Sequence, residues 1–366
     1  MTPFGRHSNP CGRIIGGGEN IDDMIAVLHK LEKKYSHRIE TNLWLGKCYY
    51  LKGLNNLNSR KKYNQIAEDY AVKAYRIDKN SFPAFFVLLN ALSSCDDFDY
   101  VLSNYGEWIR AMAPLPTGEL LPDMPPCEKW NEAKRNWQLK DNFDHLSAAI
   151  RQFEAIAESR PKDALAQLWA GYAYYHLGDY YMQIGLHKEK GVAYYDKALS
   201  YCDKALAIAP YNQEAHFWYQ LSLSRKIQVA SLFKKAAHLK SLMNHLIFCV
   251  QENALYNSAG PVYVLATMVV EGGWVCEKGM AMAGYTVDMV ITFLQIAEIL
   301  YPEDRYIPYI TGVLLERQKR DKEAIAVLER SLQKGPPAPD DPNRRDNSYN
   351  YDITRELYKK LLDRNG

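Results

Sequence analysis

Long apolar runs are absent from this sequence. No stretch of about 18 consecutive apolar residues occurs, so no membrane-spanning helix is predicted. Residues 1–20 also lack the apolar segment of about 7–15 residues that marks a secretory signal. From the sequence as it stands we expect a cytoplasmic protein, or a periplasmic one if a signal segment has been removed.

Closely paired cysteines are missing as well. The seven cysteines are odd in number, and no two of them have the spacing of a CxxC clip. This pattern favours neither a disulfide framework nor a structural zinc site. We expect most of them to be small buried side chains on helices. They are Cys11, Cys48, Cys95, Cys127, Cys202, Cys249 and Cys276.

Neither charge sign is in large excess. The chain has 45 basic and 43 acidic residues, and its formal net charge is +2. Proteins that bind nucleic acids normally gather basic residues on one face. We therefore expect no nucleic-acid partner.

Signatures of catalysis and of metal binding are also lacking. The histidines do not form an HExxH motif, and GRIIGGGEN matches neither a P-loop nor a dinucleotide fingerprint. No GxSxG occurs. Carboxylate pairs such as Asp96–Asp97 fall where helix capping explains them. We expect no enzyme, no metal site and no cofactor.

Helical periodicity is what the sequence does contain. Apolar residues recur at a spacing of about 3.6, and alternating strand-like runs are nearly absent, which predicts an all-α fold. A repeat of about 34 residues is typical of tetratricopeptide hairpins, in which small residues stand where two helices cross. Counting from Arg305, this template is matched by Gly312, Leu315, Ala324, Leu328, Ser331 and Pro336.

The same spacing recurs along the chain, for example in ETNLWLGKCYYLKG (residues 40–53) and WAGYAYYHLGDYY (residues 169–181). Each hairpin exposes an apolar face that only its neighbour covers, so the array stacks. We predict a right-handed superhelical array of about six to seven hairpins with a C-terminal capping helix.

Proline-rich and polar stretches set the expected boundaries. We predict a flexible tail, two blocks of hairpins separated by a proline-rich loop, a linker and a capping helix. In that helix Ile353, Leu357 and Leu361 would face the last repeat, with Asp352 as N-cap. Residues 274–286 are expected to be an insertion inside a hairpin. The expected segments are 1–20, 21–111, 112–130, 131–334, 335–348 and 349–366.

Part of the chain resembles a narrower group of repeat proteins. The resemblance runs from about Ala149 to Leu332 and is carried by Ala215, His216, Trp218, Tyr219, Gly260, Pro261 and Tyr263. On these residues, this part of the chain resembles the bacterial helical-repeat lipoproteins associated with TRAP-type transporters and the eukaryotic regulators of microtubule dynamics. The resemblance implies an accessory protein beside a ligand-binding subunit.

The inner groove of such an array is the expected binding surface, because the first helix of each hairpin lines it. Tyrosine suits this role, since it offers a rigid contact area with a hydrogen-bonding tip. The alternative is that these rings pack against one another or against the C-terminal helix. The candidates are Tyr50, Leu168, Tyr172, Tyr175, Phe217, Tyr263, Tyr306 and Tyr309.

The residues of the stretch WAGYAYYHLGDYY have different expected roles, according to their positions in the repeat. Gly171 is expected at a helix crossing, and Tyr174 as a packing ring. Gly178 is expected to end the helix, so that Tyr180 and Tyr181 open an inserted turn.

Two functions stay open from the sequence. The first is a non-catalytic scaffold that binds a protein partner through its groove or its edge loops. The second is a transporter-associated accessory protein that carries a small apolar or amphipathic ligand in the groove. A homo-oligomer or membership of a larger complex is compatible with either function.

Overall fold

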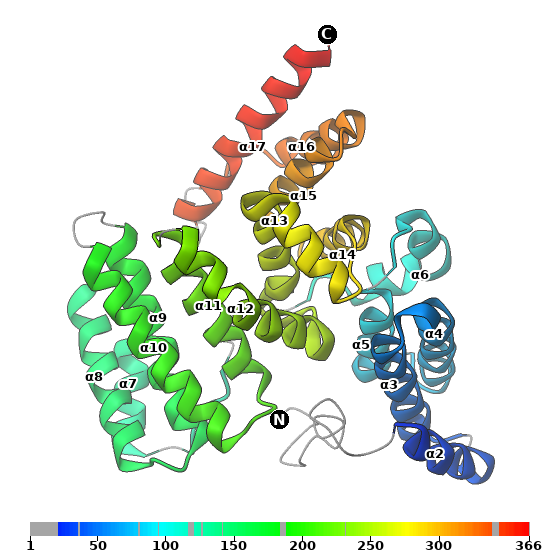
Figure 1. Ribbon diagram of the computed structural model, residues 1–366, viewed down its shortest axis with the longest axis horizontal. Coiled ribbons are helices and arrows are strands. Elements are labelled where there is room, and N and C mark those ends of the chain that lie inside the picture. The colour runs from blue at the N-terminus through cyan, green and yellow to red at the C-terminus, as the bar shows by residue number, and fades with distance from the viewer. Residues whose placement is uncertain are drawn as a thin grey trace. The chain divides into compact units, whose positions relative to one another are not determined.

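The computed structural model describes residues 21–365 apart from 36, 80, 94, 116–120, 126, 141, 184–187, 231 and 339–343. Every regular element in the described residues is a helix, and no strand occurs among them (Figure 1). The all-α prediction is confirmed. Neighbouring helices along the chain form antiparallel hairpins, as a 3.6-residue apolar spacing with short polar connections favours.

The helices gather into two compact units. The first, called the split unit, combines residues up to Thr117 with Asn253 onward, and the second, the central unit, runs from Gly118 to Glu252. The first boundary falls inside the expected proline-rich loop. The second divides the stretch 131–334, which was expected to be one array. Contacts between distant parts of the chain cause this difference, because they join the N-terminal hairpins to the C-terminal ones.

The split unit begins with hairpins built from residues 21–112. Helix α3 packs along α4, and α4 packs along α5. Ser81 and Asp97 cap α5 and α6 by accepting the backbone N–H of Ala84 and Tyr100. The elements are α2 (Ile21–Tyr35), α3 (Ile39–Asn55), η1 (Leu57–Ser59), α4 (Arg60–Ile77), α5 (Phe82–Leu92) and α6 (Phe98–Met112).

The C-terminal helices complete the split unit. Helix α6 packs against α14, and the Leu115 amide donates to the Leu300 carbonyl at 2.9 Å. The Arg60 guanidinium donates to the Gly284 carbonyl and lies over the Tyr285 ring. The elements are α13 (Tyr256–Met282), α14 (Val287–Leu300), α15 (Tyr306–Arg317), α16 (Asp321–Gln333) and α17 (Arg344–Asn365).

The central unit is a row of hairpins around an aromatic core. Trp130, Trp137, Phe153 and Trp169 are all buried and in mutual ring contact. Helices α9 and α10 pack closely side by side along their length. The elements are α7 (Glu128–Gln138), α8 (Phe143–Ser159), α9 (Ala164–Gln183), α10 (Lys188–Ile208), α11 (Gln213–Gln228) and α12 (Leu232–Asn253).

Glycines mark the closest helix crossings. A Cβ at Gly171 would lie 3.1 Å from the Cys202 sulfur, and one at Gly312 would lie 2.7 Å from Leu328. Both crossings were predicted from the repeat spacing, and both are confirmed. Gly178 differs from its prediction. It lies inside α9, which continues to Gln183, and a Cβ there would lie 2.6 Å from the Tyr195 ring.

Helix α9 therefore also contains Tyr180 and Tyr181, which were expected in a turn. Both rings contact Phe143 at the start of α8, with centroids 5.0 and 6.1 Å apart. Stacking between these rings favours continuing the helix by another turn over ending it at Gly178.

Residues 274–286 were expected to be an insertion, but most of them belong to α13. The helix bends at Gly273, whose φ of +60° favours glycine, and then continues to Met282. Beyond the bend, Cys276 and Met280 are buried, while Trp274 is 65% exposed.

Helix α17 begins within the expected linker, so Asp352 lies inside the helix and does not cap it. Leu357 and Leu361 are buried as expected, and Thr354 is buried where Ile353 was expected. No proline or glycine lies between Arg344 and Asp352, so the helix can begin before its first apolar positions.

One described helix, α13, is long and apolar enough to cross a membrane by length and composition alone. Half of its apolar window is buried inside the protein. Helices α14 and α15 pack against α13. Packing inside the split unit accounts for its apolar residues.

Candidate functional site

Five of the eight groove candidates are buried. Each exposes 6% or less of its surface, so none presents a ring or side chain to a partner in this conformation. Helix α3 packs against α5 and α9 packs against α11, and the inward side chains of these first helices fill the space between them. These five are packing residues: Tyr50, Leu168, Tyr172, Tyr175 and Phe217.

Tyr172 and Tyr175 show how the space is filled in the central unit. Their rings lie 4.3 and 5.3 Å from the Trp218 ring of α11. The Tyr172 ring also contacts Trp137 at 5.0 Å. The tryptophans occupy the place that a ligand was expected to take. Burial raises the pKa of the Tyr175 hydroxyl, which therefore stays protonated.

Tyr50 plays the equivalent role in the split unit. Its hydroxyl lies 3.3 Å from the Ser93 hydroxyl, and the ring belongs to a cluster with Leu51, Ala67 and Ala91. Burial raises the pKa of Tyr50 well above its usual value.

The remaining candidates, Tyr263, Tyr306 and Tyr309, lie together and are half-buried. The Tyr263 and Tyr306 rings are 5.7 Å apart at an edge-to-face angle, and the Tyr306 and Tyr309 rings are 6.0 Å apart. We call these three residues, with Thr267, the tyrosine face. It is formed by α13 and α15.

Hydrogen bonds fix part of the tyrosine face. The Thr267 hydroxyl donates to the Tyr263 carbonyl at 2.9 Å and lies 3.1 Å from the Tyr306 hydroxyl. Burial raises the pKa of Tyr309, so this phenol stays protonated and can donate a hydrogen bond. The face therefore offers ring surface and polar tips together.

Helix α17 borders the tyrosine face. Glu316, at the end of α15, pairs with Lys360 at 2.8 Å and with Arg364 at 3.2 Å. These contacts hold α17 along α15 and leave the three rings half-buried at its edge.

The structure also brings together residues that the sequence left apart. The His216 and His245 rings of the central unit are in contact, with their Nδ1 atoms 2.8 Å apart. The pair lies 29 positions apart in the chain, so the local spacing carries no signal for it. Burial lowers the pKa of both histidines, that of His245 to about 4 with a contribution from His216.

In the part of the chain that the structure describes, no group of three histidine, cysteine, aspartate or glutamate side chains is placed to hold a metal ion. Burial raises the pKa of the Cys202 and Cys249 thiols, which makes them poor nucleophiles.

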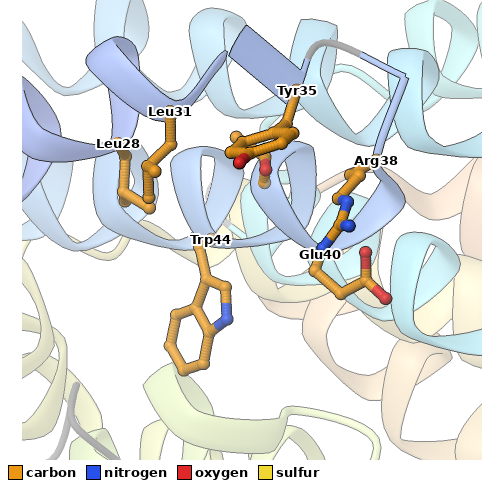
Figure 2. A pocket seen from close by; sticks show the side chains of 7 residues that line it. Leu28, Leu31, Tyr35, Arg38, Glu40 and Trp44 are labelled. Carbon is orange, nitrogen blue, oxygen red and sulfur yellow. The ribbon is translucent and has the colours of Figure 1, made fainter.

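Helices α2 and α3 form a groove that was not predicted from the sequence (Figure 2). Its volume is about 390 Å³. In Figure 2, Leu28 and Leu31 lie toward one end, and Arg38 and Glu40 lie together at the other. It is lined by Leu28, Leu31, Tyr35, Arg38, Glu40, Thr41 and Trp44.

A tetratricopeptide repeat family model matches residues 142–180 and 293–339. The first segment covers α8 with most of α9, and the second contains α15 with α16. These two segments match tetratricopeptide repeats. The second segment includes the hairpin that was read from Arg305 in the sequence, and it holds two of the three rings of the tyrosine face.

No curated protein matches the chain in sequence. Among solved structures, it is similar to a thermophilic tetratricopeptide protein of Thermus thermophilus, with 18% identity over 64% of this chain and 98% of that one and a TM-score of 0.37. The tetratricopeptide domain of P58(IPK) gives 13% identity over 96% and 97% of the two chains and a TM-score of 0.21. Yeast Tom70 gives 13% identity over 93% and 86% and a TM-score of 0.19. Likenesses at these scores identify neither a shared arrangement of the repeats nor a shared partner.

Proposed function

We propose that this chain is a non-catalytic tetratricopeptide scaffold that binds a protein partner through the tyrosine face. The observation that carries the proposal is the contact of three half-buried rings on the first helices of consecutive hairpins. The other five candidates are buried, which leaves this face as the place where the predicted groove positions meet solvent.

The chemistry of the face suits a peptide chain. Half-buried phenols lose little rotational freedom on binding, and they contribute both ring contact and hydrogen bonds. Because Thr267 donates its proton to the Tyr263 carbonyl, the Tyr306 hydroxyl donates to Thr267, and its oxygen can accept a backbone N–H of a partner. We expect the rings to dominate the affinity, as buried aromatic residues do at most protein interfaces.

The test compares binding by two variants with binding by the wild type. Tyr306→Ala with Tyr309→Ala removes two rings of the face, and Tyr211→Ala removes a half-buried tyrosine of the central unit as a matched control. Proteins from the source cells that co-purify with the wild type are quantified on each variant after circular dichroism has verified folding. A partner should fall at least about tenfold on the double variant and remain on the control, as expected for loss of a central hot spot. Equal recovery on both variants contradicts the proposal.

The transporter-accessory alternative predicts a different observation. Native mass spectrometry would then show a co-purified small apolar molecule that the double variant loses. Such a result, without any protein partner, would replace the scaffold proposal with the ligand-carrying one.

A further inference from the structure

The α2–α3 groove has an apolar floor that remains open to solvent. Leu28, Leu31 and Tyr35 recur at the spacing of one helix face and line the groove with Trp44 of α3. Leu31 is 41% exposed, and Val27, one turn earlier, is 55% exposed. The opposite side of α2 packs on the hairpin behind it, where His29 contacts the Tyr49 and Tyr70 rings. The open side is therefore an apolar surface that this hairpin does not cover.

Basic side chains follow one edge of that floor. Lys30, Lys34 and Arg38 are exposed, and none of them makes an ion pair with a described residue. The ammonium of Lys34 and the guanidinium of Arg38 lie 5.3 and 5.0 Å from the centre of the Tyr35 ring. At about 100° per residue, Lys34 lies about 60° from Leu31 around the helix, whereas Lys33 lies about 160° from it.

The acidic residues nearby do not balance this edge. The Glu32 carboxylate is engaged by α4, where it accepts from the Tyr70 hydroxyl at 3.0 Å and pairs with Lys73 at 3.3 Å. Glu40 is the one acidic residue that lines the groove. The groove thus combines an apolar floor with an edge that holds more basic than acidic residues.

We propose that the α2–α3 groove binds an acidic amphipathic peptide segment of a protein partner. Its apolar side chains lie against Leu31 and Trp44, and its carboxylates pair with Lys34 and Arg38. In recognition of this kind, an amphipathic helix places its apolar face in an apolar groove, and its charged residues pair with those of the groove and set its position along it. The site is separate from the tyrosine face and does not depend on it.

Basic and apolar side chains together could also bind an anionic membrane. The geometry of the α2–α3 groove favours a peptide over a membrane. The apolar contact is concave, and Trp44, on the second helix, is half-buried. A flat bilayer would also press Glu40 against lipid head groups of like charge.

A selection experiment tests the proposal without a known ligand. A displayed library of random 16-residue peptides is selected on the full chain, and enriched sequences are read by deep sequencing. The selections are repeated on Leu31→Glu, on Lys34→Glu with Arg38→Glu, and on Lys33→Glu. The last variant makes the same charge change on the same helix but away from the groove. Circular dichroism verifies that each variant is folded.

The expected result is enrichment of peptides with apolar residues at helical spacing and Asp or Glu beside them. Leu31→Glu should abolish that enrichment, and Lys33→Glu should retain it. The double charge reversal should weaken selected peptides by up to about tenfold, since two exposed ion pairs are lost, and should instead enrich basic peptides.

Three results would overturn the proposal. One is enrichment of neutral or basic peptides on the wild type, and another is equal enrichment on all three variants. The third is the absence of any enrichment while vesicles of phosphatidylserine and phosphatidylcholine bind the wild type and not the Lys34→Glu, Arg38→Glu variant. That last result would assign the surface to a membrane.

Discussion

The imidazoles of His216 and His245 meet with their Nδ1 atoms 2.8 Å apart. The Nε2–H of His216 donates to the Pro210 carbonyl at 2.9 Å, so a neutral His216 accepts at Nδ1 and His245 donates from its Nδ1–H. The Tyr219 ring stacks on His245, and the Phe248 ring stacks on His216. The fold therefore holds both rings in the neutral form.

This pair predicts a loss of stability in acid. Burial and the neighbouring His216 lower the pKa of His245 from 6.5 to about 4. The unfolded chain therefore binds more protons than the folded chain between these values. The stabilisation from this histidine is complete above pH 6.5 and is lost as the pH falls toward 4, with no further loss below that.

Thermal unfolding across pH 4–7.5 measures this effect. His245→Phe keeps a ring against Tyr219 but does not titrate, so its Tm should fall less steeply with acid than that of the wild type. His37→Gln, at an exposed histidine, should leave the slope unchanged. Identical slopes for His245→Phe and the wild type would show that the pair does not control the acid response.

A methyl group at Gly178 should destabilise the central unit. Its Cβ would lie 2.6 Å from the Tyr195 ring, which cannot swing away easily because its hydroxyl donates to Asp179 at 2.5 Å. Gly178→Ala should cost about 1–3 kcal/mol in urea unfolding through overpacking. Gly279→Ala is the control, because no atom lies within 4 Å of its Cβ and helix propensity favours alanine by about 0.5–1 kcal/mol. Equal effects of the two changes would exclude the close crossing.

Leu361 is the most deeply buried leucine of the capping helix. Leu361 is fully buried, whereas Leu362 beside it is 42% exposed. Leu361→Ala should lower the free energy of unfolding by about 2–5 kcal/mol. If α17 detaches before the rest of the protein unfolds, the same substitution should make α17 sensitive to limited proteolysis. Leu362→Ala should change it by less than about 0.5 kcal/mol. A large effect at Leu362 with none at Leu361 would mean that α17 docks through another face.

A carboxylate shared by two tyrosines stabilises the packing of α4 against α6. One oxygen of Glu68 accepts from the Tyr100 hydroxyl at 2.9 Å and from the Tyr105 hydroxyl at 2.8 Å. Burial raises the pKa of Glu68, and the two phenols oppose that rise. Tyr105→Phe should therefore raise the pKa of Glu68 further and should cost about 1.5–3 kcal/mol of stability at pH 7.

Tyr75→Phe is the matched control for this prediction. The Tyr75 ring stacks on Trp108 with a centroid distance of 4.0 Å, and the substitution keeps that contact. It should change stability by less than about 0.5 kcal/mol. A double-mutant cycle with Glu68→Gln should show coupling for Tyr105, and its absence would contradict the shared carboxylate.

The repeat pattern could be predicted because it depends on residue size. Gly171 and Gly312 are small where helices cross, and Leu328 is large where it fills space, so spacing alone indicates the hairpins. The exposure of groove positions could not be predicted in this way. Tyr172 and Tyr309 both occupy inward positions of a first helix, but Trp218 of the next hairpin covers Tyr172.

Features that depend on contacts between distant residues could not be predicted from the sequence either. The Leu115–Leu300 hydrogen bond joins segments 185 positions apart, so no local pattern signals the split unit. The His216–His245 pair and the α2–α3 groove arise from packing between helices as well. Of the eight groove candidates, Tyr263, Tyr306 and Tyr309 are the ones that neighbouring described helices leave half-buried.

Photo-crosslinking in cells tests the central claim most directly. A benzophenone amino acid is placed at Tyr309, on the tyrosine face, and in a second protein at Tyr211, which is also half-buried. The scaffold account predicts that irradiation joins one defined polypeptide to position 309 and none to position 211. An adduct at 211 alone, or no adduct at 309 in cells that express the protein normally, would contradict it.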